Sequence, residues 1–191
     1  MPQGRESSMP SADLWESFFD PAGILDALGC RGVCGDLIEF GCGYGSFTVA
    51  AAPRISGTVY ALDIDPAMVD ATARRVTQAG LGNVVVELRD FVAVGTGLAD
   101  DTAMFALNFN LLHIEDPVSL LREAYRVVRP GGSLGVIHWK CDVVTPRGPS
   151  LEIRPQPADC RAWGEQAGFR WGRYQDLPGS PWHWGMVMAR P

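Results

Sequence analysis

The sequence lacks several features that would place the protein in a specialised class. No apolar run approaches the ~20 residues that a membrane-spanning helix needs. The 16 basic residues are outnumbered by 22 acidic ones, and no cluster of lysine and arginine forms a stripe that could follow a phosphate backbone. These absences predict a protein with neither a membrane nor a nucleic acid as its partner.

Cysteine pairs and targeting signals are also lacking. The five cysteines are an odd number without the spacing of a disulfide framework or a zinc site, which favours reduced thiols in the cytoplasm and no bound metal. Residues 1–11 are polar and contain proline, unlike a signal peptide. We therefore expect a cytoplasmic protein in which residues 1–11 are disordered and residues 12–191 form a single domain.

What the sequence does contain is a glycine-rich turn directly after an apolar strand. Residues 36–45 read DLIEFGCGYG. Glycine at every second position lets the backbone approach a bound ligand where a Cβ would collide. Glycine-rich turns also exist simply to reverse the chain, so this segment alone leaves both interpretations open.

A second strand-like segment, residues 58–62, is followed by an acid. Asp63 lies about 20 residues beyond the glycines, where a doubly wound fold places the acid that accepts hydrogen bonds from ribose hydroxyls. An ordinary turn aspartate is the alternative. Asp65 precedes Pro66, and this pair predicts the N-cap and the first residue of a helix.

Strand and helix patterns alternate along the rest of the chain. A helical lead-in segment at 12–30 is interrupted at Asp20-Pro21, and residues 140–157 are rich in proline and predict a long loop. The expected strands are 36–40, 58–62, 84–88, 104–107, 134–138, 170–176 and 183–189, and the expected helices between them are 44–52, 66–79, a helix from Pro117, and 158–167. This order predicts an α/β fold with a doubly wound, mostly parallel sheet.

Five segments, in this order, resemble the class I S-adenosylmethionine-dependent methyltransferases. They are residues 39–45 (EFGCGYG), 62–68 (LDIDPAM), 90–91 (DF), 108–113 (NFNLLH) and 121–132 (LREAYRVVRPGG). The resemblance covers roughly residues 36–139. It implies a Rossmann-like seven-stranded sheet of order 3-2-1-4-5-7-6 with the last strand antiparallel. It also implies transfer of a methyl group from S-adenosyl-L-methionine to a small-molecule acceptor, with S-adenosyl-L-homocysteine as the product.

The resemblance assigns cofactor-binding residues by position. Glu39 corresponds to the acid that helps to hold the methionine part of the cofactor, and Asp63 to the acid that binds the ribose. The residues expected beside the adenine are Ile64, Asp90 and Phe91, with Asn108 closing the pocket. The loop residues that let the backbone approach the cofactor are Gly41, Cys42, Gly43 and Gly45.

The acceptor side is defined less sharply. His113 matches a histidine that many small-molecule members carry, which makes it the candidate catalytic base, although a capping or packing role fits equally well. His138 and Asp142 are alternative bases, and an acceptor that has no proton to lose needs none. The residues expected to line the acceptor pocket are Trp15, Phe18, Phe19, Asn110 and Trp139, with 140–157 as a lid-like loop. Packing of the aromatic residues on the outer sheet is the alternative.

Two other functions stay open. A nicotinamide-dependent oxidoreductase is disfavoured because the third glycine of a dinucleotide fingerprint would stand at position 46, which is Ser46. No Lys-Ser or Lys-Thr follows the glycines, which excludes a nucleotide-triphosphate loop. A protein that binds S-adenosylmethionine without catalysis and acts through partners is the second alternative.

Overall fold

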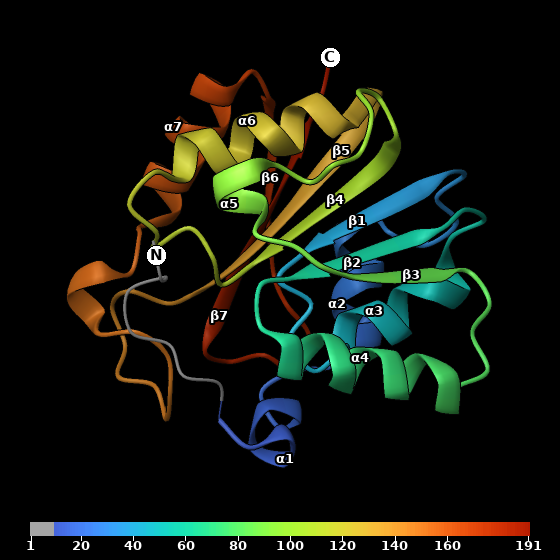
Figure 1. The fold of residues 1–191 in the computed structure, drawn as a ribbon. Coiled ribbons are helices and arrows are strands. Elements are labelled where there is room, and N and C mark those ends of the chain that lie inside the picture. Colours follow the sequence, from blue (N-terminus) through green and yellow to red (C-terminus); the bar gives the residue numbers. More distant parts are fainter. Residues whose placement is uncertain (1–9) are drawn as a thin grey trace.

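Strands and helices alternate along the chain until two antiparallel strands end it (Figure 1). The computed structural model describes residues 10–191. The prediction that residues 1–11 are disordered therefore falls mostly on residues 1–9, which lie outside the described part of the chain. The elements are α1 (Ala12–Glu16), α2 (Pro21–Leu28), β1 (Asp36–Phe40), α3 (Ser46–Ala51), η1 (Ala52–Arg54), β2 (Val59–Asp63), α4 (Pro66–Gln78), β3 (Val84–Leu88), α5 (Phe91–Val94), β4 (Ala103–Phe109), α6 (Pro117–Val127), β5 (Val128–Trp139), η2 (Leu151–Ile153), α7 (Pro157–Ala167), β6 (Arg170–Gln175) and β7 (His183–Ala189). Among the described residues, no helix is long and apolar enough to cross a bilayer.

The seven strands form one sheet of order β3-β2-β1-β4-β5-β7-β6. Strands β1 to β5 pair in parallel, whereas β7 runs antiparallel to both β5 and β6. The predicted order and the predicted antiparallel last strand are confirmed. Because the parallel strands share one direction, the segments that follow them emerge along the same edge of the sheet.

Several helices begin where an aspartate precedes a proline. The side chain of Asp65 accepts a hydrogen bond from the Ala67 amide at 2.8 Å, and Asp116 accepts one from the Ser119 amide at 3.0 Å. Each carboxylate satisfies a backbone donor of the first turn that has no partner within the helix, and proline has no such donor to lose. The predicted N-cap at Asp65 is confirmed.

Helices cover both faces of the sheet. Helices α2, α3 and α4 lie on one face, and α5, α6 and α7 on the other (Figure 1). Alternate residues of the central strands therefore enter different cores: Leu37 packs with α2 and α3, whereas Ile38 packs with α6. Both cores are apolar and closely packed, so the strand ends between them are held in fixed positions.

Some boundaries differ from the predicted ones. Strand β5 begins at Val128, directly after α6, because Val128 already pairs with Ala103 before the register shifts to Ser133 and Phe105. The glycine turn was expected to precede this strand, and instead lies within it as an irregular stretch. Helix α5 was not predicted; its four residues follow Asp90, whose side chain caps it.

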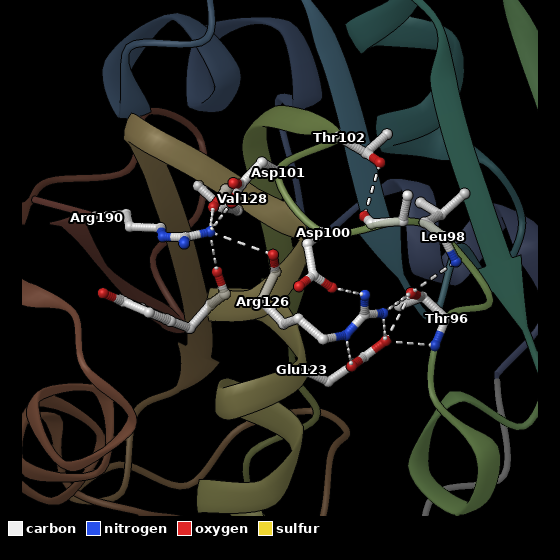
Figure 2. A network of polar contacts seen from close by, with 11 residues as sticks. Thr96, Leu98, Asp100, Asp101, Thr102, Glu123, Arg126, Val128 and Arg190 are labelled. Atoms are coloured by element: carbon white, nitrogen blue, oxygen red, sulfur yellow. Dashed lines mark hydrogen bonds and ion pairs between the residues drawn. The ribbon is translucent and has the colours of Figure 1, made fainter.

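A polar network lies at the end of the sheet where β4 and β5 begin (Figure 2). The Arg126 guanidinium donates to both carboxylate oxygens of Glu123, at 2.7 and 2.8 Å, and to Asp100 at 2.6 Å. Glu123 also accepts from the amide and the hydroxyl of Thr96, each at 2.7 Å. These contacts tie the loop before β4 to α6.

Arg190 fastens the last residues of the chain to the same region. Its Nη1 atom donates to the carbonyl oxygens of Tyr125, Arg126 and Val128, and it also contacts the Asp101 carboxylate (Figure 2). A cation at the C-terminal end of α6 satisfies carbonyls that have no helical partner and complements the helix dipole. The antiparallel strand β7 is thereby tied to the parallel part of the sheet.

Glu123 is expected to make protein stability depend on acid pH. Hydrogen bonds, first from Arg126 and then from Thr96, lower the pKa of Glu123 to about 2, against 4.5 without them. The stabilisation of the fold by the ionised Glu123 side chain is therefore complete above pH 4.5 and is lost as pH falls toward 2. We expect Glu123→Gln to lower the free energy of unfolding at pH 7 by about 1 to 3 kcal/mol in urea titrations, less at pH 3.

Glu165→Gln is the matched control, because Glu165 forms an exposed ion pair with Arg161 within one helix turn and should change stability by less than about 0.5 kcal/mol. A Glu123→Gln variant with the same deficit at pH 3 and pH 7 would contradict this assignment.

Candidate functional site

The glycine loop between β1 and α3 is fastened by the end of β2. The Gly43 amide donates to Asp63 Oδ2 at 2.8 Å, and the Asp65 amide donates to Asp63 Oδ1 at 3.0 Å. On the other side, Thr72 Oγ1 in α4 donates to the Gly43 carbonyl at 2.8 Å. Asp63 therefore lies at the tip of β2, as predicted, and its side chain holds the glycine loop in place through a hydrogen bond.

Glycine is required in this loop for both conformation and space. Gly41, Gly43 and Gly45 have φ values of 72°, 55° and 77°, in the left-handed region that other residues rarely adopt. A Cβ on Gly45 would lie 2.9 Å from Thr72 Oγ1 and 3.2 Å from the Thr72 Cα. The alternate glycines thus allow the loop to fold tightly against α4.

Two buried carboxyl groups lie beside the loop. Glu39 is 3% exposed, and its Oε2 atom accepts a hydrogen bond from Thr48 in α3. Burial raises the pKa of Glu39 to about 8, and burial also raises the pKa of Asp63. A cation bound near them would stabilise their charged forms. The site therefore suits a ligand with a positive charge.

The residues predicted to contact an adenine follow β2 and β3. Ile64 is 48% exposed, which is unusual for a large apolar side chain and leaves it free to contact a ligand. The Asp90 side chain accepts from the Ala93 amide at 3.0 Å, so it caps α5. The Phe91 ring is buried edge-on against Phe40, with 5.3 Å between ring centroids, and its side chain belongs to the core.

Asn108 and His113 lie at the end of β4 on the face that α6 covers. Asn108 is fully buried, and neither its amide nitrogen nor its oxygen has a hydrogen-bond partner among the described residues. His113 is 7% exposed, and its Nε2 atom likewise lacks a partner there. Buried polar atoms without partners are costly, so these three atoms are suited to a polar ligand.

The other predicted pocket residues gather on the opposite face. Phe18 packs against Trp139 with ring centroids 5.5 Å apart, and Phe19 packs against His183 at 4.6 Å. Asn110 Nδ2 lies 3.5 Å from His183 Nε2. Trp15 packs on Phe19 at 4.9 Å. The structure thus brings Trp15, Phe18, Phe19, Asn110 and Trp139 together and separates them from His113.

Sequence reasoning missed His183 and Glu16. His183 stands 44 positions beyond Trp139, and only the antiparallel pairing of β5 with β7 places them opposite each other. Glu16 in α1 accepts hydrogen bonds from Ser46 and from Arg75 of α4. Nothing local distinguishes Glu16 from an ordinary surface acid, so only the fold reveals that α1 is tied to the glycine loop.

The proline-rich loop 140–157 packs over the Trp139 side of the site. The Arg154 guanidinium donates to the carbonyl oxygens of Pro149 at 2.8 Å and Lys140 at 2.9 Å, which joins the two ends of the loop. Gly148 lies so close to the Trp139 ring that a Cβ would be 2.9 Å from it. Within the loop, η2 is a short helix that was not predicted.

Comparison with known proteins gives a consistent match. Residues 37–132 match the protein family described as methyltransferase domain. The nocamycin O-methyltransferase of Saccharothrix syringae is 36% identical over 124 residues, which are 62% of this chain and 43% of the relative. The ribosomal protein L11 methyltransferase of Methylococcus capsulatus is 33% identical over 151 residues, 76% of this chain and 48% of the relative. The chain spans less than half the length of these relatives.

A solved structure shares the fold over nearly the whole chain. It is a crystal structure of a SAM dependent methyltransferase from Aquifex aeolicus, with a TM-score of 0.82 and 24% sequence identity. The superposition covers 96% of this chain and 100% of the other. The two chains therefore share one fold.

The contact of Gly45 with α4 predicts a specific cost of substitution. Gly45→Ala adds both the strain of a positive φ and a clash with Thr72, whereas Gly80→Ala adds only the strain, because Gly80 has φ +65° with nothing within 4 Å of the added Cβ. We expect Gly80→Ala to cost about 1 kcal/mol and Gly45→Ala about 2 to 4 kcal/mol in urea titrations. Equal costs would show that the loop and α4 are not closely packed.

Proposed function

The chain belongs to the class I S-adenosylmethionine-dependent methyltransferase family, and from this premise we propose that it transfers a methyl group from S-adenosylmethionine to a small-molecule acceptor by in-line displacement. The single observation that carries the proposal is the junction of the glycine loop with Asp63 at the strand ends. When bound, the cofactor supplies an electrophilic methyl group on a sulfonium. The protein supplies binding, orientation and exclusion of water.

The cofactor residues proposed here are those whose surroundings suit its parts. Asp63 accepts one backbone amide at each carboxylate oxygen, and each oxygen keeps a further lone pair for a ribose hydroxyl. Glu39 lies beside the loop for the charged methionine part, Ile64 offers an exposed apolar side chain to the adenine, and the Asn108 amide has no hydrogen-bond partner within residues 10–191. The remaining proposed contacts are Asp90, the Phe91 amide, and the backbone of Gly41, Cys42, Gly43 and Gly45.

The charge of the site favours this cofactor over a nicotinamide dinucleotide. A dinucleotide places a doubly charged pyrophosphate near the glycine loop, where the Asp63 carboxylate would repel it and the buried Glu39, with its pKa raised to about 8, would be pushed further toward its neutral form. The nearest arginine of α4, Arg75, is already paired with Glu16. A sulfonium and an ammonium group, in contrast, are stabilised by the same carboxyl groups.

We place the acceptor between the end of β4 and the segments that roof it. Phe18 and Phe19 of the lead-in segment and Trp139 beneath the loop 140–157 are nearly fully buried and pack in the core on the α2 and α3 face, so they would form an apolar wall at the strand ends that suits a small acceptor better than a macromolecule. Asn110 supplies a polar group on this face, and His113, the proposed catalytic base, lies on the α6 face, so the reacting group of the acceptor would lie at the strand ends where the two faces meet. Most of the rate should come from holding acceptor and methyl group in line.

Calorimetry tests the binding part of the proposal. We expect S-adenosylmethionine or S-adenosylhomocysteine to bind in the micromolar range and NADH not to bind. Asp63→Ala should weaken binding by on the order of 1 to 3 kcal/mol, because ribose and loop donors lose their acceptor. Asp116→Ala removes the same group from the start of α6 and should leave the dissociation constant unchanged, which makes it the control.

Turnover separates the enzyme from a protein that only binds the cofactor. Release of S-adenosylhomocysteine in a screen of phenols, enols, amines and thiols would support catalysis on a small molecule. Binding without turnover on any of these acceptors would favour the non-catalytic alternative or a macromolecular acceptor.

In the calorimetric test, full affinity for S-adenosylmethionine in a folded Asp63→Ala protein would rule out the assignment of Asp63 to the ribose.

A further inference from the structure

Two of the three histidines in the sequence form a buried pair. His113 Nδ1, in the turn after β4, lies 3.2 Å from His138 Nε2, near the end of β5. His113 is 7% exposed and His138 is fully buried. At this distance one nitrogen must carry the proton and the other a lone pair, because two lone pairs or two protons would repel each other.

A backbone carbonyl decides which nitrogen carries the proton. The other ring nitrogen of His138, Nδ1, faces the Trp139 carbonyl oxygen at 3.4 Å, and a carbonyl oxygen can only accept. A neutral imidazole has one N–H, so its place on His138 Nδ1 leaves Nε2 as an acceptor. His113 must then donate from Nδ1, which leaves a lone pair on His113 Nε2.

Both rings are neutral at neutral pH, so this assignment of tautomers applies to them. Burial, followed by the positive charge of Arg154, lowers the pKa of His113 to about 4. Burial and the neighbouring His113 lower the pKa of His138 to about 3, with smaller contributions from His183 and Arg154. Neither ring therefore carries a second proton before it meets a substrate.

The two rings differ in how firmly they are held. His138 belongs to β5 and stacks on Trp184 of the antiparallel strand, with 26° between the ring planes and 6.2 Å between centroids. His113 belongs to a turn, and its Nδ1 contact is with His138. Its Nε2 atom is buried without a partner among the described residues. The strand residue thus sets the orientation of the turn residue.

We propose that His138 is a positioning residue that holds His113 in the tautomer with a lone pair on Nε2, and that this lone pair takes the proton of an acidic hydroxyl acceptor, a phenol or an enol. The proposal rests on the methyl transfer proposed above. It goes beyond that function by naming the class of acceptor and the atom that receives the proton.

The proton balance fits this acceptor class. The acceptor proton passes to His113 Nε2 while the acceptor oxygen takes the methyl group. The bonding pair of the broken carbon–sulfur bond stays on sulfur, and the positive charge of the sulfonium ends on the His113 ring, which then releases its proton to water. The hydroxyl must lose its proton as its oxygen is methylated, and phenols and enols lose a proton to a neutral imidazole far more readily than aliphatic alcohols do.

Nitrogen NMR on the full chain tests the tautomers directly. With three histidines there are six ring nitrogens, and His183→Gln removes one assigned pair as a control on the other face of the sheet. At pH 7 we expect protonated Nδ1 and unprotonated Nε2 signals for both His113 and His138. In His138→Leu the His113 Nε2–H form should become populated, whereas His138→Gln, whose amide oxygen can accept the same hydrogen bond, should preserve the wild-type tautomer.

The wild-type spectrum decides the question even if His138→Leu fails to fold. A proton on His113 Nε2 in the wild-type protein would overturn the proposal, and so would an unchanged His113 tautomer in a folded His138→Leu variant. Calorimetry with S-adenosylmethionine on the same samples keeps the two proposals apart. Lack of cofactor binding would refute the proposed function, and the wrong tautomer with normal cofactor binding would refute only the role of the histidine pair.

Discussion

The hydrogen bond from the Gly43 amide to the Asp63 carboxylate is the interaction on which the rest of the site depends. It joins the turn after β1 to the tip of β2, and the Thr72 hydroxyl closes the loop from the other side. The loop can take this path only because Gly41, Gly43 and Gly45 adopt positive φ values. A single carboxylate thus shapes the loop and retains lone pairs for the ribose hydroxyls that we propose it binds, so the same group would serve both the fold of the site and its ligand.

The acceptor side that we propose is built differently, because it draws on both faces of the sheet. Phe18, Phe19 and Trp139 pack on the face of α2 and α3, whereas Asn108, His113 and His138 lie on the face of α6. The strand ends are where the two faces meet. We infer that the aromatic side shapes the space and the histidine side handles the proton, a division that follows from the alternation of side chains along β4 and β5.

The shape of the glycine loop and the place of Asp63 at the tip of β2 could be predicted from the sequence because their signals are local. The alternate glycines and Asp63 lie within one strand–helix–strand unit formed by β1, α3 and β2, and the Asp65-Pro66 cap follows directly. The acceptor side depends on contacts between distant segments. His183 meets Trp139 only through the pairing of β5 with β7, and Glu16 meets Arg75 only when α1 folds back on α4. Helix α5 could not be predicted from the sequence, because its four residues are too few to show a helical periodicity.

Hydrogen–deuterium exchange with S-adenosylmethionine tests the central claim, that the strand ends around Asp63 form the cofactor site. The account predicts slower exchange in residues 41–46, 63–65 and 108–113 with the cofactor present and no such change with NADH, since bound ligand restrains the amides that line it. A groove of about 770 Å³ between the β6–β7 hairpin and the start of α7 is the competing location. Protection confined to that groove, with the glycine loop unchanged, would contradict the account.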